Sequence, residues 1–173
     1  MGQSGTASRA AAAELLLLVL EERRTLDEAL NSVDAYETLQ GPDRGFARAM
    51  ASAALRQLGR INLALQPVLD RPLEAASPAA RAFLLIGAAQ IWCLDTPAHA
   101  AVGETVEAAK SIPDTRRAAG FLNAVLRKLP QQKSDFDALP AEDIWPDWFR
   151  NVLHGQFDEA NSAALAQQQL AVP

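Results

Sequence analysis

Cysteine and histidine are scarce in this sequence of 173 residues, which contains one cysteine and two histidines. The single Cys93 excludes an intramolecular disulfide and a cysteine-cluster metal site. It lies in a strongly apolar stretch, and we expect a structural role because apolar surroundings disfavour the reactive thiolate. His99 and His154 are far apart and have no acidic or cysteine neighbours at ligand spacing. The sequence therefore predicts neither a metal site nor a histidine-based catalytic centre.

Several other sequence signals are missing. No apolar run reaches the roughly 20 residues that a transmembrane helix needs, and residues 1–14 lack the basic start and apolar middle of a secretory signal. We therefore expect a cytoplasmic protein without membrane contact. The sequence has no glycine-rich phosphate loop, nucleophile elbow or dinucleotide fingerprint, and no stretch alternates with period two. These absences predict a helical binding domain that carries no catalytic motif of its own.

Hydrophobic residues make up 49% of the sequence, and they are densest over residues 79–94. Beyond the first turn of this stretch, Gln90 is the only strongly polar side chain. A helix that is apolar on every side has to pack inside other helices, so we expect a buried central helix here. Ser77 and Pro78 are typical of an N-cap and a first helical position. Small residues such as Gly87 would let a neighbouring backbone approach closely.

Apolar residues at helical spacing predict further helices around the central one. They cover residues 9–23, 26–32, 43–70 with a break near Gly59, 97–110, 116–129, 146–154 and 158–168. Phe121 and Val125 should point inward from their helix. The polar, proline-containing residues 131–142 are predicted to be a linker, so that residues 8–130 form one domain and residues 131–173 a connection. We expect an all-α bundle of about six to seven helices, followed by a short helical C-terminal tail.

The net charge of −5 is unevenly distributed. Residues 1–133 hold 15 Lys and Arg against 14 Asp and Glu, whereas residues 134–173 hold one Arg against seven acidic residues. A near-neutral body can still bind nucleic acid, because local patches rather than totals govern phosphate contact. One half of the helical wheel of the 43–70 segment is basic, through Arg44, Arg48, Arg56 and Arg60. A second basic cluster consists of Arg9, Arg116, Arg117, Arg127 and Lys128.

Two interpretations of these basic residues stay open. Exposed charges usually do no more than solvate a surface, and the sharper hypothesis is that they contact RNA phosphates. A similar choice applies to the aromatic residues Trp145, Trp148 and Phe149. Stacking on nucleic-acid bases is one option. Packing against the body or a partner domain is the interpretation that we favour.

Motifs spread over residues 79–129 resemble those of a known family. They are the apolar central stretch, Pro97 and His99, V-x-E-x-V-E-x-A-K over residues 102–110, and F-L-N-A-V-L over residues 121–126. Together with Asp43-Arg44-x-Phe46-Ala47 upstream, these motifs resemble the NusB family of helical RNA-binding proteins. The resemblance covers residues 8–130. It implies an all-α fold and RNA contact through the amino-terminal region and nearby basic residues.

Three further details are similar to one branch, the amino-terminal region of the Sun/RsmB-type methyltransferases. They are Leu-Asp-Thr-Pro at residues 94–97, Leu-Asn-Ala-Val-Leu-Arg at residues 122–127 and Trp-Pro-x-Trp at residues 145–148. Those enzymes join a NusB-like domain to an S-adenosylmethionine-dependent domain that methylates carbon 5 of a cytosine in small-subunit (16S) ribosomal RNA. The resemblance implies two partners, which are small-subunit ribosomal RNA and the chain's own C-terminal methyltransferase domain.

The sequence departs from this branch because the catalytic domain is absent. The chemistry of that domain relies on two cysteines, one after Pro and one after Thr, and on a glycine-rich cofactor loop, whereas Cys93 follows Trp92. We therefore expect an excised domain that is no enzyme by itself and holds no cofactor, with S-adenosylmethionine expected for the missing domain. Two alternatives remain. One is a free-standing NusB-type transcription antitermination factor with a ribosomal-protein partner, and the other is an interdomain packing module that touches no RNA.

Overall fold

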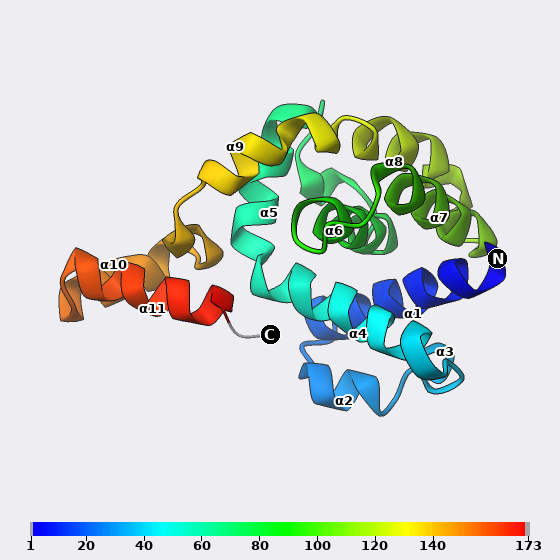
Figure 1. Cartoon of the computed structure of the whole chain (residues 1–173), viewed down its shortest axis with the longest axis horizontal. Coiled ribbons are helices and arrows are strands. Elements are labelled where there is room, and N and C mark those ends of the chain that lie inside the picture. The colour runs from blue at the N-terminus through cyan, green and yellow to red at the C-terminus, as the bar shows by residue number, and fades with distance from the viewer. Residues whose placement is uncertain (1, 172–173) are drawn as a thin grey trace.

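The computed structural model describes residues 2–171, with side chains from Gly5 onward, and this part of the chain contains helices and no β-strand (Figure 1). The prediction of an all-α fold is therefore confirmed. The larger helices of the body are α1 (Gly2–Leu20), α4 (Gly41–Arg56), α5 (Leu58–Leu65), α6 (Pro78–Trp92), α7 (Ala98–Ser111) and α8 (Ala119–Leu126). The other α-helices are α2 (Leu26–Leu30), α3 (Asp34–Glu37), α9 (Lys133–Ala138), α10 (Asp147–Gln156) and α11 (Glu159–Ala171).

Helix α6 forms the centre of the body, as predicted from residues 79–94. It packs against α1, α4, α5, α7, α8 and α9, and Figure 1 shows it nearly end-on among its neighbours. Every residue from Ala82 to Trp92 is buried. The start is also as predicted, because the Ser77 hydroxyl accepts a hydrogen bond from the Ala80 amide at 3.3 Å. Burial of the whole circumference explains why this helix has no polar face.

Two features of α6 let neighbouring helices lie close to it. Gly87 faces α8 so closely that a β-carbon there would collide with the Leu126 side chain. Gln90 is buried, and its Nε2 donates hydrogen bonds to the Ile86 carbonyl at 3.1 Å and to the Thr105 hydroxyl of α7 at 2.9 Å. Because a buried polar group costs free energy unless it is hydrogen-bonded, this contact favours one placement of α7 against α6.

The basic helix breaks earlier than the sequence suggests. Instead of one segment that breaks near Gly59, α4 ends at Arg56 and Gln57 separates it from α5, with φ −102° and ψ 12°. In Figure 1 the two helices run in clearly different directions. Gly59 does not mark the break but a close approach of two chain segments, because a β-carbon there would collide with the backbone of Asp143 and Ile144. Glycine therefore allows the C-terminal part of the chain to pack directly on α5.

Residues 131–142 are not an extended polar linker, which corrects the sequence prediction. They contain the end of η4 (Leu129–Gln132), all of α9 and the beginning of η5 (Ala141–Ile144). Phe136 of α9 is buried and stacks on Trp92, with ring centroids 4.9 Å apart. The Trp92 indole N–H also donates to the Leu129 carbonyl at 2.9 Å. The segment looks polar in sequence because few residues of so short a helix reach the core.

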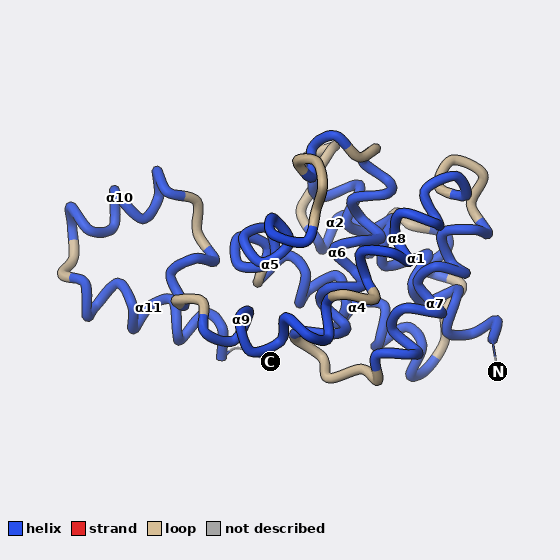
Figure 2. The backbone as a smooth tube through the Cα atoms, turned by 90° about the horizontal axis from the view of Figure 1, so that it is seen from above, coloured by secondary structure: helices blue, strands red, loops and turns tan. Residues whose placement is uncertain are grey.

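The C-terminal tail consists of η5, α10 and α11, and it projects from one side of the body (Figures 1 and 2). The two helices lie close to the predicted positions. The tail contacts the body chiefly where η5 packs on α5, and α11 packs on η5. Helix α10 has no buried residue, while α11 buries Ser162 and Ala166. Most of the tail surface is therefore open to solvent.

Candidate nucleic-acid interface

The first half of α4 presents two of the predicted arginines to solvent. Arg44 and Arg48 are exposed and lie one turn apart. The Arg44 guanidinium lies over the Tyr36 ring, 4.8 Å from the ring centroid. Such a cation–π contact holds a side chain in place and leaves its charge intact. Arg56 is partly buried in the last turn of α4.

Arg60 does not belong to this exposed face, which corrects the sequence prediction. It is 8% exposed, because the break at Gln57 turns α5 toward α9. Its Nη2 donates to the Phe136 carbonyl at 2.9 Å and to the Leu139 carbonyl at 3.1 Å. The guanidinium also lies 4.7 Å from the centroid of the Phe136 ring. Arg60 therefore caps the C-terminal end of α9 through the Phe136 and Leu139 carbonyl groups and is unavailable to phosphates.

Arg9 is a second correction, because it is 4% exposed. Its Nη1 donates to the Gly5 carbonyl at 2.9 Å, and its guanidinium lies 5.2 Å from the centroid of the Phe46 ring of α4. Burial lowers the pKa of Arg9, and the nearby Glu104 carboxylate of α7 opposes this shift. Arginine nevertheless remains charged in proteins. Arg9 thus connects α1 to both neighbouring helices rather than facing solvent.

The remaining predicted cations surround α8, and all of them are exposed. Two lie in η3 (Arg116–Ala118), which leads directly into α8, and two follow the helix. The Arg116 Nε donates to the Lys110 carbonyl at 3.0 Å, and the Lys128 ammonium donates to the Val68 carbonyl at 3.5 Å. Neutral carbonyl partners leave the positive charges unneutralised. The members of this group are Arg116, Arg117, Arg127 and Lys128.

The predicted cations at the surface differ from most other cations of the chain in that they form no ion pair among the described residues. In the part of the chain that the structure describes, no carboxylate lies within 4.0 Å of any predicted cation that reaches the surface. Arg23 and Arg71 share this property, although the sequence did not single them out. Acidic partners are found instead for Arg24, Arg81, Lys110, Lys133 and Arg150. The predicted surface cations can therefore bind phosphate without first losing an ion pair.

The structure gathers the surface cations into two groups and keeps the groups apart. Helix α4 packs on α1 and α6, whereas α8 packs on α6 and α7. In Figure 1, α4 and α8 lie on opposite sides of α6. We name the first group the α4 surface (Arg44, Arg48 and Arg56) and the second the α8 surface (Arg116, Arg117, Arg127 and Lys128).

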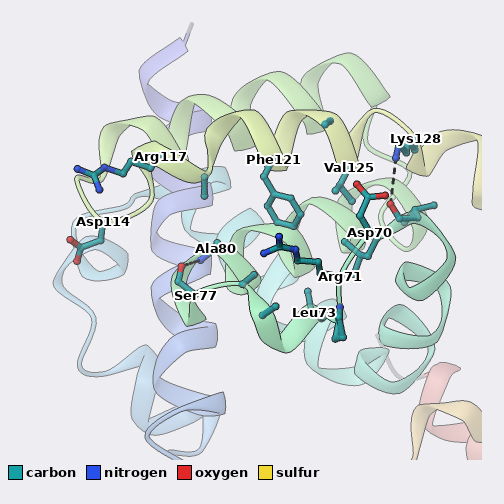
Figure 3. A pocket seen from close by; sticks show the side chains of 17 residues that line it. Asp70, Arg71, Leu73, Ser77, Ala80, Asp114, Arg117, Phe121, Val125 and Lys128 are labelled. Carbon is teal, nitrogen blue, oxygen red and sulfur yellow. Dashed lines mark hydrogen bonds between the residues drawn. The ribbon is translucent and has the colours of Figure 1, made fainter.

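A groove of about 530 Å³ lies beside the α8 surface, between α8 and residues 68–77 (Figure 3). Arg117 and Lys128 line it, and so do Arg71 and Phe121, which sequence reasoning did not select for binding. Phe121 is 39% exposed, so the prediction that it points inward is wrong. Helical spacing contained the signal, because Phe121 lies one turn after Arg117 and two turns before Lys128, on the same face.

Cys93 ends α6 beside the core and has little reactivity in this position. Burial raises the pKa of the Cys93 thiol to about 12, so the thiol stays protonated near neutral pH. His154 Nε2 lies 2.9 Å from a carboxylate oxygen of Glu142 in the tail, far along the chain from His99 on α7. Among the described residues, no group of three His, Cys, Asp or Glu side chains is placed to hold a metal ion.

A membrane-crossing helix is not found in the described residues, since none of their helices is both long and apolar enough.

Comparison of the sequence with known families assigns most of the chain to one of them. The model of the NusB family matches residues 6–131. This match covers well over half of the sequence, and the chain belongs to the NusB family.

Within this family, the chain is similar to proteins named ribosomal RNA small subunit methyltransferase B, and three of them are compared below. The chain is 37% identical over 177 aligned residues to the protein from Xanthomonas campestris pv. campestris. This alignment covers 98% of this chain and 39% of the relative. The protein from Pseudomonas putida is 31% identical over 170 residues, with 95% and 38% covered. The protein from Vibrio vulnificus is 30% identical over 156 residues, with 87% and 36% covered. The chain thus spans less than two fifths of the length of these curated relatives.

Proposed function

We propose that this chain is the RNA-docking module of a longer small-subunit rRNA (cytosine-C5) methyltransferase. The observation that carries the proposal is a set of surface cations on a NusB-family domain that have no carboxylate partner in the described part of the chain. The names of the similar proteins supply the substrate class, small-subunit ribosomal RNA. Residues 8–130, with α9 packed on them, would then form the RNA-binding domain, and the tail from η5 onward would be the connection to the methyltransferase part.

The α4 and α8 surfaces would hold RNA through its phosphates. Each exposed guanidinium can donate two parallel hydrogen bonds to one phosphate, whereas Lys128 acts as a point charge. Contacts of this kind read little of the base sequence and weaken steeply as salt is added. The methyltransferase part, rather than this domain, would therefore choose the cytosine.

The chemical step belongs outside this chain in our proposal. S-adenosylmethionine would supply the methyl group when bound to the methyltransferase part. Cys93 does not suit the role of nucleophile, because partial burial raises the pKa of its thiol and so disfavours the reactive thiolate. We therefore assign no step of methyl transfer to the residues of this chain.

The tail offers a surface for contact with the methyltransferase part of the same protein. Trp148 and Val152 of α10 are 68% and 55% exposed, and Phe157 directly after the helix is 48% exposed. Large apolar side chains gathered in this way are typical of a protein contact surface. The packing interpretation of the aromatic residues thus applies to the tail, and RNA docking applies to the body. We propose that the assembled protein works in the cytoplasm without membrane or metal.

A free-standing antitermination factor is the competing assignment for a NusB-family domain. The names of the similar proteins favour the methyltransferase. Sequencing the gene beyond codon 173 distinguishes the antitermination factor from the methyltransferase module. An open reading frame that continues into a methyltransferase is the expected result, and a stop codon directly after residue 173 would contradict our proposal.

RNA binding by this chain is tested by titrating small-subunit rRNA fragments at about 50 and 200 mM salt. We expect binding at the lower concentration and a loss of at least tenfold at the higher one, because phosphate contacts release counterions. The near-neutral body predicts modest affinity. No binding at either salt concentration would overturn the proposal.

Charge reversal then tests the two surfaces separately. The double variants R44E/R48E and R116E/R117E should each weaken binding. The matched control is R24E/K133E, which introduces the same change in net charge at two cations that already have acidic partners. Equal losses in all three variants would mean that total charge rather than these surfaces governs binding.

A further inference from the structure

The tail carries an open apolar surface in an acidic part of the chain. Trp148, Val152 and Phe157 are 68%, 55% and 48% exposed, and we name these three side chains the tail face. From Glu142 to Glu159 the sequence holds five acidic residues against one arginine. That arginine, Arg150, already binds two of the carboxylates. The tail face therefore combines large apolar side chains with an excess of negative charge in its neighbourhood.

The groove beside α8 offers apolar surface that is also uncovered. Its apolar residues include Leu73 and Val125. Figure 3 shows the ring of Phe121 projecting from α8 toward residues 68–77, with the Arg71 side chain reaching into the same space. The volume of about 530 Å³ lies in the range of sites that hold small molecules, so a large aromatic side chain has room in it.

Cations outnumber carboxylates along this groove. Arg71, Arg117 and Lys128 line it, against Asp70 and Asp114. Neither arginine has a hydrogen-bond or carboxylate partner among the described residues, and Lys128 bonds only to a backbone carbonyl. An acidic occupant would form ion pairs here without first breaking any. A purely apolar occupant would cover the cations without supplying an anion, which costs free energy.

We propose that the tail face of one copy of this chain docks in the groove beside α8 of a second copy, with Trp148 packed against Phe121. The two surfaces are complementary in charge and share an apolar centre. They do not meet within one copy, because both aromatic side chains are exposed and the tail is held on α5 through η5. In the longer protein of our proposed function, the methyltransferase part would cover the tail face, so this contact concerns copies in which the face is free.

The proposed contact joins two different surfaces. Each copy supplies one tail face and one groove, so two copies can exchange their tails reciprocally, or the contact can continue from copy to copy. In both arrangements one partner needs only its tail face and the other needs only its groove. Added salt should shift the assembly toward the monomer, because ion pairs at the surface are screened.

Complementary variants test the contact. W148S removes the centre of the tail face, and R71E/R117E reverses the charge of the groove. Each variant alone should self-associate at least about 30-fold more weakly than the natural chain, which is the loss typical of a central tryptophan in an interface. An equimolar mixture should restore association, but only as 1:1 dimers, because one variant keeps the groove and the other keeps the tail face. Sedimentation velocity at several protein concentrations measures each sample.

Two controls accompany the mixture. R24E/K133E makes the same change in net charge as R71E/R117E, but at two cations that already have acidic partners, and it should associate like the natural chain. W148F keeps an aromatic side chain in the tail face and should retain most of the association. Restored association in the mixture also shows that neither W148S nor R71E/R117E has lost its fold.

Three outcomes would overturn the inference. The first is a natural chain that stays monomeric up to about 1 mM. The second is a mixture that associates no more strongly than its components, because the tail face and the groove would then not be partners. The third is an equal loss in R24E/K133E, which would mean that total charge governs association. None of these measurements involves RNA, so a chain that associates as described but binds no RNA would overturn the proposed function and leave this inference intact.

Discussion

The body and the tail of this chain are stabilised in different ways. In the body, α6 is buried along its length within one continuous apolar core that extends to Phe136 of α9. In the tail, α10 buries no residue. Its order comes from local contacts instead, such as the hydrogen bond of the Trp145 indole to the Gln169 side chain at 3.0 Å and the ion pairs of Arg150. A segment with few buried apolar contacts has little stability of its own, so we infer that the tail depends on what it contacts.

The junction between the two regions rests on adjacent residues of α5. Gly59 leaves room for the backbone of η5, and Arg60 donates hydrogen bonds to the carbonyls of Phe136 and Leu139. These contacts hold the start of the tail against the body. The direction in which the tail leaves the body is therefore set by α5 and not by the tail helices.

The largest effect is expected in the body core, from F83A. Phe83 is 1% exposed in α6, and removal of a buried phenylalanine ring typically costs about 3–5 kcal/mol through lost burial and the resulting cavity. Urea unfolding monitored by circular dichroism measures the loss. A cost below about 1 kcal/mol would mean that the body core is not close-packed, and the contrast with the tail would then fail.

A smaller and more local effect is expected at the junction, from R60M. Methionine keeps the apolar stem but loses the bonds to two carbonyl groups, and we expect a loss of about 2 kcal/mol. Hydrogen exchange should become faster over residues 131–145 and remain slow in α6. The control is R56M, which removes a partly buried arginine that has no carboxylate partner among the described residues and should cost less than about 0.5 kcal/mol. Equal effects of both variants would contradict the role of Arg60 in attaching the tail.

Alkaline pH should weaken the body through Cys93. The pKa of this thiol is raised from 9.0 to about 12 by burial. Below pH 9 both folded and unfolded chains keep the proton, so the thiol does not affect stability. Between pH 9 and 12 only the unfolded chain loses it, so stability falls as pH rises. By pH 10 the natural chain should lose about 1 kcal/mol more than C93A. Parallel pH profiles of the two proteins would show that the thiol is not buried.

The smallest effect is expected on the open face of the tail, from W148S. Trp148 is 68% exposed, so its removal should change the free energy of unfolding by less than about 0.5 kcal/mol. The same variant should reduce any self-association seen in analytical ultracentrifugation. W145S is the comparison, since Trp145 is partly buried and bonds to Gln169, and about 1 kcal/mol is expected. A larger cost for W148S than for W145S would contradict our description of the tail.

Much of the fold could be predicted from local patterns. The central helix, its cap at Ser77 and the approach of a neighbour at Gly87 follow from apolar density, capping chemistry and side-chain size, which short stretches contain. The break between α4 and α5 was predicted near Gly59 and lies two residues earlier, at Gln57, where neither glycine nor proline marks the position. The structure of residues 131–142 was missed because Phe136 alone carries the core contact of α9.

The candidate site was predicted less completely than the fold. The basic residues around α8 lie on the surface as expected, while Phe121 was expected to be buried with its neighbours. Its spacing from Arg117 and Lys128 places it on their face of the helix, but the groove that leaves it exposed is formed with residues 68–77, which a helical wheel of α8 does not contain. Arg71 lies in that distant segment, so only the folded chain brings it near the ring.

Periodicity, caps and charge are local properties, so the helical class, the buried centre and the number of available cations can be predicted from the sequence. Which of those cations reach solvent depends on how distant segments pack together. Arg56 and Arg60 lie one turn apart in sequence, yet Arg60 is withdrawn by a carbonyl that lies 76 residues further along the chain. The exposure of a side chain depends on contacts between segments that are distant in sequence, and the spacing of residues within one helix contains no information about those contacts.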